Sequence, residues 1–297
     1  SMFGFQRIGD LAWAAGDSRA RGFLLGATAG RTTLNGEGLQ HEDGHSHLMA
    51  ATIPNCVSYD PTFHYELALI IQDGLRRMVQ EQEDVFYYLT VMNENYSHPA
   101  CPKGAEKGIL KGLYKLNETG NGKRETAKSR KAKPRVQLLG SGTILHEVIA
   151  AAELLERDWG VAADVWSATS FNELRREAQE THRWNLLHPD KKQKVSFVEQ
   201  CLDGTDGPIV AATDYMRAYP DQIRPYLHRR YVTLGTDGFG RSDSREALRR
   251  FFEVDRHYVV LAALKALADE GVIPAGKAAE AIKKYGIDAD RPNPVNV

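Results

Sequence analysis

The sequence predicts an α/β protein built from parallel sheets, and three observations support this prediction. Short runs rich in β-branched and aromatic residues alternate along the chain with longer segments whose apolar residues repeat at helical spacing. Several strand-like runs end in glycine or in polar side chains, as strands do where they lead into a loop. A basic stretch with almost no apolar residues divides the chain. We therefore expect two α/β domains joined by a linker.

The N-terminal part begins with a short helix over residues 10–15, capped by Asp10, and an apolar run, Phe23–Ala27, that should be a buried strand. This strand leads into a polar loop, residues 30–47, whose glycines let the backbone adopt positive φ and approach a ligand closely. The loop holds three histidines and three carboxylates, which can act as acids, bases or ligands near neutral pH. The same composition is equally typical of a solvated surface loop.

Three further elements complete the first part of the chain. Residues 61–80 should form a helix, because Pro61 suits a first turn and the apolar residues that follow keep helical spacing. Residues 85–92 predict a buried strand, and residues 93–96 lie at its end, where α/β sheets place ligand-facing loops. That tetrapeptide is equally compatible with a turn or with a contact to substrate or to a partner subunit. Residues 105–116 should form a short helix.

Residues 117–135 mark the boundary between the two expected domains. They are rich in Lys and Arg and offer almost nothing to bury, so they cannot offset the entropy of ordering. A basic run can also attract nucleic acid or an anionic surface, but a short interdomain segment of this kind is more often simply solvated. We therefore divide the chain into a first domain over 1–116, a basic flexible linker over 117–135 and a second domain over 136–297.

The second domain opens with a βαβ unit. A strand over 136–142 enters a glycine turn, a helix capped by Thr143 follows, and a second strand runs over 161–167. Such a unit requires parallel strands. Residues 208–215 predict another buried strand with a polar end. The remaining expected elements are helices over 171–183, 257–270 and 275–285 and a strand over 231–234.

A glycine-rich string, residues 235–243, precedes a short helix expected over 247–252. Ser242 or Asp243 can cap that helix. A helix start beside Arg241 would also suit an anionic group, although a capped turn explains the string without one.

Composition narrows the classes of function. The formal net charge is -1, which argues against a nucleic-acid-binding protein. Cys56, Cys101 and Cys201 form no C-x-x-C pair and no even framework, so we expect reduced thiols. No apolar run approaches the roughly 18 residues of a membrane helix, and no signal peptide opens the sequence. We expect a soluble, cytoplasmic protein that binds neither membranes nor nucleic acid.

The histidines of the loop are also compatible with a metal site. His41 and His45 have H-x-x-x-H spacing, which binds zinc when both side chains share one helical face. Gly44 and the neighbouring glycines argue against a helix here, and His47 would need a different loop geometry. A metal-dependent hydrolase is therefore an alternative with a less favourable geometry.

The loop string from Gly30 to His47 also resembles a known family. It is similar to the active-site loop in the middle domain of the homodimeric bacterial pyruvate dehydrogenase first component, a thiamine-diphosphate enzyme of the transketolase-like superfamily. The similarity covers nearly the whole chain. It extends through the strings at 53–56, 59–61, 93–96, 140–142 and 213–215 and through Gly-Thr-Asp-Gly-Phe-Gly-Arg-Ser-Asp-Ser-Arg-Glu at 235–246.

The resemblance implies a fold and a set of cofactors. Residues 1–116 would be the C-terminal part of the pyrimidine-binding domain, and residues 136–297 would be a domain of transketolase C-terminal type. The family's Gly-Asp-Gly motif, with its later Asn, is not found in this sequence. We therefore expect the chain to be the C-terminal part of a longer enzyme and inactive alone. The principal ligands of thiamine diphosphate and Mg²⁺ should lie outside it.

The resemblance also implies an activity and the residues that perform it. The whole enzyme would decarboxylate pyruvate and reductively acetylate lipoyl groups of a dihydrolipoyl acyltransferase, as a homodimer within a multienzyme complex. His41 would be the catalytic donor to the substrate, and Glu37 would tune it. His45 and His47 are expected to be hydrogen-bonded loop histidines. The alternative is a module with only a structural or dimerisation role.

Overall fold

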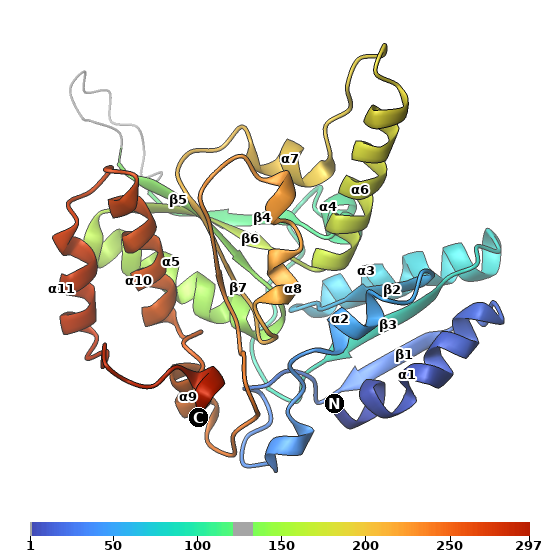
Figure 1. Ribbon diagram of the computed structural model, residues 1–297, viewed down its shortest axis with the longest axis horizontal. Coiled ribbons are helices and arrows are strands. Elements are labelled where there is room, and N and C mark those ends of the chain that lie inside the picture. Colours follow the sequence, from blue (N-terminus) through green and yellow to red (C-terminus); the bar gives the residue numbers. More distant parts are fainter. Residues whose placement is uncertain (1, 121–132) are drawn as a thin grey trace.

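The computed structural model describes residues 2–120 and 133–297 and confirms the α/β class (Figure 1). Two sheets form the framework: a three-stranded sheet of order β1-β3-β2 and a five-stranded sheet of order β4-β6-β5-β7-β8. The strands are β1 (Phe23–Ala27), β2 (Cys56–Tyr59), β3 (Phe86–Val91), β4 (Tyr114–Glu118), β5 (Arg135–Gly140), β6 (Ala162–Ser167), β7 (Ile209–Ala212) and β8 (Tyr231–Leu234). All neighbouring strands run parallel except β4, which pairs antiparallel with β6.

Helices surround both sheets. Those of the first part are α1 (Met2–Asp17), α2 (Ser46–Ala50), α3 (His64–Leu75) and α4 (Glu106–Lys111), with the π-helical turn η2 (Arg76–Gln80) directly after α3. Those of the second part are α5 (Leu145–Trp159), α6 (Phe171–Leu187), α7 (Phe197–Leu202), α8 (Ala218–Asp221), α9 (Arg245–Phe251), α10 (Arg256–Asp269) and α11 (Gly276–Lys284). Short 3-10 turns complete the description: η1 (Leu39–His41), η3 (Gly142–Ile144), η4 (Arg224–Tyr226) and η5 (Pro294–Asn296). Among the described residues, no helix is both long and apolar enough to cross a lipid bilayer.

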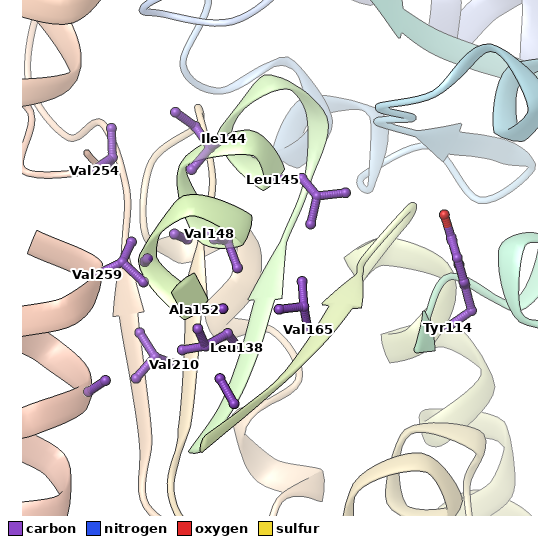
Figure 2. Packing of buried hydrophobic residues seen from close by; sticks show 14 of the residues in the cluster. Tyr114, Leu138, Ile144, Leu145, Val148, Ala152, Val165, Val210, Val254 and Val259 are labelled. Carbon is purple, nitrogen blue, oxygen red and sulfur yellow. The ribbon is translucent and has the colours of Figure 1, made fainter. Parts of the chain in front are cut away.

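The five-stranded sheet buries both of its faces, because side chains alternate along each strand. Leu138 of β5 and Val210 of β7 belong to the core on the side of α5. The next residue of each strand, Leu139 and Ala211, belongs to a second core on the side of α6, α7 and α8. Figure 2 shows Val148 and Ala152 of α5 packed against this first face. Complete burial of each valine or leucine contributes about 1.5–3 kcal/mol.

Several expectations about local structure are wrong. The first helix starts at Met2, so Asp10 lies inside α1 and does not cap it. Pro61 lies before α3, which begins at His64. The helix expected over 105–116 ends at Lys111, because Gly112 takes a left-handed conformation (φ 103°), and β4 begins two residues later. The strand β1 is not buried but lies at the edge of its sheet, where Leu25 is 59% exposed. Thr143 does not cap a helix, since it lies inside η3 and α5 starts at Leu145.

The expected linker, residues 117–135, begins within β4 and ends at the first residue of β5. Its central part, residues 121–132, lies outside the described residues. The proposed division of the chain therefore rests on the sequence. Of the expected linker, the structure describes only residues 117–120 and 133–135, which include the end of β4 and the start of β5.

Candidate active site

The carboxyl ends of strands from both sheets meet at one place. Asp60 directly follows β2, Ser141 directly follows β5, and Asp214 lies two residues beyond β7. The loop that leaves β1, residues 28–45, runs across these strand ends. Ligands of open α/β sheets bind at such a crevice outside the carboxyl ends of the strands.

The first part of the loop is held by Asp214. Both carboxylate oxygens of Asp214 lie 3.1 Å from the Thr32 backbone nitrogen and accept its hydrogen. Gly30 adopts φ 91°, and a Cβ at this position would lie 2.3 Å from the Asp214 Oδ2 atom. Glycine is therefore required at position 30 because the backbone passes close to the Asp214 carboxylate of the protein itself.

The last part of the loop is held by its own acids. Asp43 accepts hydrogen bonds from the backbone N–H groups of His45 (3.0 Å) and Ser46 (2.9 Å), and α2 begins at Ser46. The buried Glu42 carboxylate accepts the backbone N–H of Arg241 at 2.6 Å. These contacts fix the loop at its second end.

Helix α9 supplies two arginines to the same region. Arg245 donates from its Nε to the Thr33 carbonyl at 2.9 Å. Arg249 donates to the carboxylate of Glu94, and Glu94 also accepts the Thr143 hydroxyl at 2.7 Å. The segment after β3 is thus held by internal contacts. Ser244 caps α9, accepting the Ala247 N–H at 3.3 Å, so the expectation of Ser242 or Asp243 as cap is wrong.

A chain of buried hydrogen bonds links the two sheets beneath the loop. The His47 Nε2 atom lies 3.1 Å from the Thr90 hydroxyl, and this hydroxyl donates to Asp60 at 2.7 Å. Asp60 also accepts the Ser141 hydroxyl at 2.9 Å, and the Ser141 and Thr213 hydroxyl oxygens lie 2.9 Å apart. The imidazole of His47 stacks on Tyr219, with ring centroids 4.8 Å apart.

Burial sets the ionisation of this network. It raises the pKa of Asp60, Asp214 and Glu42 to about 7 each, although hydrogen bonds and nearby arginines act in the opposite direction on these carboxyls. Burial also lowers the pKa of His47 to about 4, so its imidazole is neutral at physiological pH.

The two residues implicated in catalysis lie in the outer part of the loop. Glu37 is exposed, and His41 is half-buried at the end of η1, where its backbone N–H donates to the Gly38 carbonyl at 2.9 Å. His45 is also half-buried, whereas His47 is fully buried. Within residues 2–120 and 133–297, the ligand atoms of the loop histidines and carboxylates do not form a group that could hold a metal ion.

Sequence analysis did not identify Asp60, Asp214 or Thr90 as parts of this region. For Asp214 a signal existed, because it lies in the polar end of the strand predicted over 208–215. Both aspartates also lie in strings that carry the family resemblance, at 59–61 and 213–215. Thr90 lies inside β3 and carried no comparable signal.

Comparisons with known proteins agree with this architecture. Residues 1–99 match the family described as pyruvate dehydrogenase E1 component middle domain, and residues 122–255 match the transketolase-like TK C-terminal domain. The pyruvate dehydrogenase E1 component of Cupriavidus necator is 64% identical over 297 residues, which are 100% of this chain and 32% of that protein. The pyruvate dehydrogenase E1 component of Pseudomonas aeruginosa is 65% identical over 297 residues, which are 100% of this chain and 33% of that protein. The chain thus spans about a third of the length of these curated relatives.

A solved transketolase variant from Pichia stipitis has the same fold. It superimposes with a TM-score of 0.65 at 16% identity, over 91% of this chain and 33% of that one. The high identity along the entire chain and the matches of its two parts lead to one assignment. The chain belongs to the pyruvate dehydrogenase E1 component family.

Proposed function

We propose that this chain supplies the substrate-facing loop of a thiamine-diphosphate-dependent pyruvate dehydrogenase. The whole enzyme decarboxylates pyruvate and reductively acetylates lipoyl groups of a dihydrolipoyl acyltransferase, and it acts as a homodimer. The identity to pyruvate dehydrogenase E1 components along the entire chain supports this proposal. We also propose the division expected from the sequence, with a first domain over 1–116, a linker over 117–135 and a second domain over 136–297. Strand β4 extends across the first boundary and pairs in the five-stranded sheet.

The observation that carries the proposal is how the loop is held. Its two ends are fixed by buried groups, namely Asp214 at one end and Glu42 and Asp43 at the other. Glu37 and His41 lie between these fixed ends and retain exposed surface. A loop anchored in this way presents titratable groups in a defined position, which catalysis requires.

The cofactor requires residues that this chain does not offer at the loop. Mg²⁺ takes oxygen ligands, often one or two carboxylates together with phosphate oxygens. Within the described residues, the carboxylates of the loop do not gather into a metal-binding group, and Glu42 and Asp43 accept backbone N–H groups instead. We propose that the principal ligands of thiamine diphosphate and Mg²⁺ belong to parts of the enzyme outside this chain.

The role of His41 is that of a donor. Its imidazole donates a hydrogen bond or a proton to an oxygen of the bound 2-oxo acid as negative charge develops there. Glu37, four residues earlier in the same loop, influences the imidazole through its negative charge. The neutral, buried His47 is not a candidate for this role, because its ring is enclosed by Tyr219 and the Thr90 hydroxyl.

The test is His41→Ala in the complete enzyme at saturating thiamine diphosphate and Mg²⁺. We expect turnover to fall about 10²–10⁴-fold, the usual contribution of general acid–base catalysis. Glu37→Gln should slow turnover less. His45→Ala is the matched control, because His45 is equally half-buried in the same loop. Near-full activity of His41→Ala together with loss of activity in His45→Ala would overturn the assignment of His41.

A further inference from the structure

Two histidines and two carboxylates gather on the five-stranded-sheet side of the molecule, away from the candidate active site. Glu199 and Asp203 lie one helical turn apart, at α7 and its C-terminal end, and His228 lies in the segment between η4 and β8. In Figure 1, α7 lies at the top of the view, whereas the loop of residues 28–45, in blue, lies at the bottom. Among the described residues, Glu199, Asp203 and His228 are the group whose ligand atoms all lie within 4.8 Å of one another.

The Glu199 carboxylate is oriented by its neighbours. Its Oε2 atom accepts hydrogen bonds from the Ser196 hydroxyl and from the Ser196 backbone N–H at 2.9 Å. Its Oε1 atom lies 3.3 Å from the His228 Nε2 atom. Hydrogen bonds to one oxygen of a ligating carboxylate are a usual device for aiming the other oxygen at a metal.

The other donors are accessible and adjustable. The His228 side chain is 67% exposed, and Asp203 is exposed as well. A second imidazole, that of His182 on α6, lies with its Nε2 atom 3.7 Å from the Glu199 Oε2 atom. The His182 ring makes an edge-to-face contact with the Tyr226 ring, with centroids 4.9 Å apart.

Nitrogen and oxygen donors of this kind suit zinc better than magnesium or calcium, which prefer oxygen alone. With zinc–ligand bonds of about 2.0–2.1 Å, donors around a tetrahedral ion lie about 3.4 Å apart. The present spread of 4.8 Å must therefore contract, and the exposed side chains of Asp203 and His228 are free of packing that would oppose a change of rotamer. We propose that Glu199, Asp203 and His228 form a zinc-binding site on this surface, with His182 or water completing the coordination.

Zinc bound here would join α7 to the segment before β8 and would restrict the motion of both.

The test is direct measurement of Zn²⁺ binding to the tag-free, full-length enzyme, in competition with a chromophoric chelator and with Mg²⁺ in excess. We expect one Zn²⁺ per chain that is lost or bound at least about tenfold more weakly in His228→Ala and in Asp203→Asn, since loss of even an outer partner costs 10–100-fold. Ser196→Ala, which removes only the orienting hydroxyl, should weaken binding to an intermediate degree.

His257→Ala is the matched control, because His257 is also an imidazole beside a single carboxylate, that of Asp255 at 3.5 Å. The His257→Ala variant should bind Zn²⁺ with the same stoichiometry and affinity as the unaltered enzyme. Zn²⁺ should also raise the unfolding temperature of the unaltered enzyme but not of Asp203→Asn. The same stoichiometry and affinity in all variants, or no bound Zn²⁺ at all, would overturn the proposal. Neither result bears on turnover of pyruvate, so the two proposals stand or fall separately.

Discussion

Asp60 gives the most quantitative prediction, because its carboxyl is buried between the two sheets with a pKa of about 7. In an unfolded chain an aspartic acid has a pKa of about 3.9. The folded protein therefore holds a proton that the unfolded chain has already released. The stability that this proton provides is lost as the pH rises from about 4 through 7. Between pH 6 and pH 8 the loss amounts to about 1.4 kcal/mol for one such group.

Asp60→Asn keeps the size of the side chain but cannot ionise. Thr90 and Ser141 donate to different oxygens of Asp60, so the amide oxygen can accept only one of these hydroxyls, while the amide NH2 can donate to the other. We expect the decrease in stability from pH 6 to pH 8 to be about 1.4 kcal/mol smaller in this variant, or about 2–4 °C in Tm for a chain of a few hundred residues. Thermal unfolding followed by circular dichroism at both pH values measures the difference. Taking the difference between variant and parent removes the contributions of the other titrating groups.

Asp190→Asn is the control, since the Asp190 side chain is 74% exposed and its charge remains in water. It should show the same pH dependence as the unaltered protein. If Asp60→Asn also retains the full pH dependence, Asp60 is ionised in the folded state.

Three further predictions concern the buried histidine, the cap of α6 and a glycine of the loop. His47→Phe keeps the stacking on Tyr219 but removes an imidazole whose pKa is lowered by burial to about 4. The unaltered protein should lose stability as the pH falls from about 6.5 toward 4, and this loss should be smaller in the variant, as measured by acid unfolding. Ser170→Ala removes the cap of α6, which accepts the Glu173 N–H at 3.0 Å, and should lower the free energy of unfolding by about 1–2 kcal/mol in urea titrations. In Gly44→Ala the new Cβ would lie 2.0 Å from the Arg31 guanidinium, and overpacking of this kind should cost about 1–3 kcal/mol in the same assay.

Strands were the elements that local sequence predicted best. The strand expected over 231–234 agrees with β8, and the one over 85–92 extends one residue beyond β3 at each end. Such runs are recognisable because β-branched and aromatic residues gather where both faces are buried. The helix expected over 105–116 failed because Gly112 was not treated as a terminator, although its left-handed conformation is typical of a helix end.

The loop with the histidines was found from its composition, but its partners were not. Thr32 and Asp214 are 182 residues apart in the chain, and no local pattern relates them. The same holds for Glu199 and His228, which are 29 residues apart and belong to different elements. Roles for Glu37 and His41 came from family resemblance, because spacing alone does not separate His41 from the other histidines of the loop.

The antiparallel strand β4 has a consequence for the integrity of the molecule. Tyr114 and Glu118 pair with Ser167 and Asp164 of β6, although β4 precedes residues 121–132 in the chain and β6 follows them. The N-terminal segment therefore contributes a strand to the sheet of the C-terminal segment. A single backbone cleavage between Glu118 and Arg135 would leave two fragments held together by this strand and by the shared core, as in a split protein that reassembles by complementation.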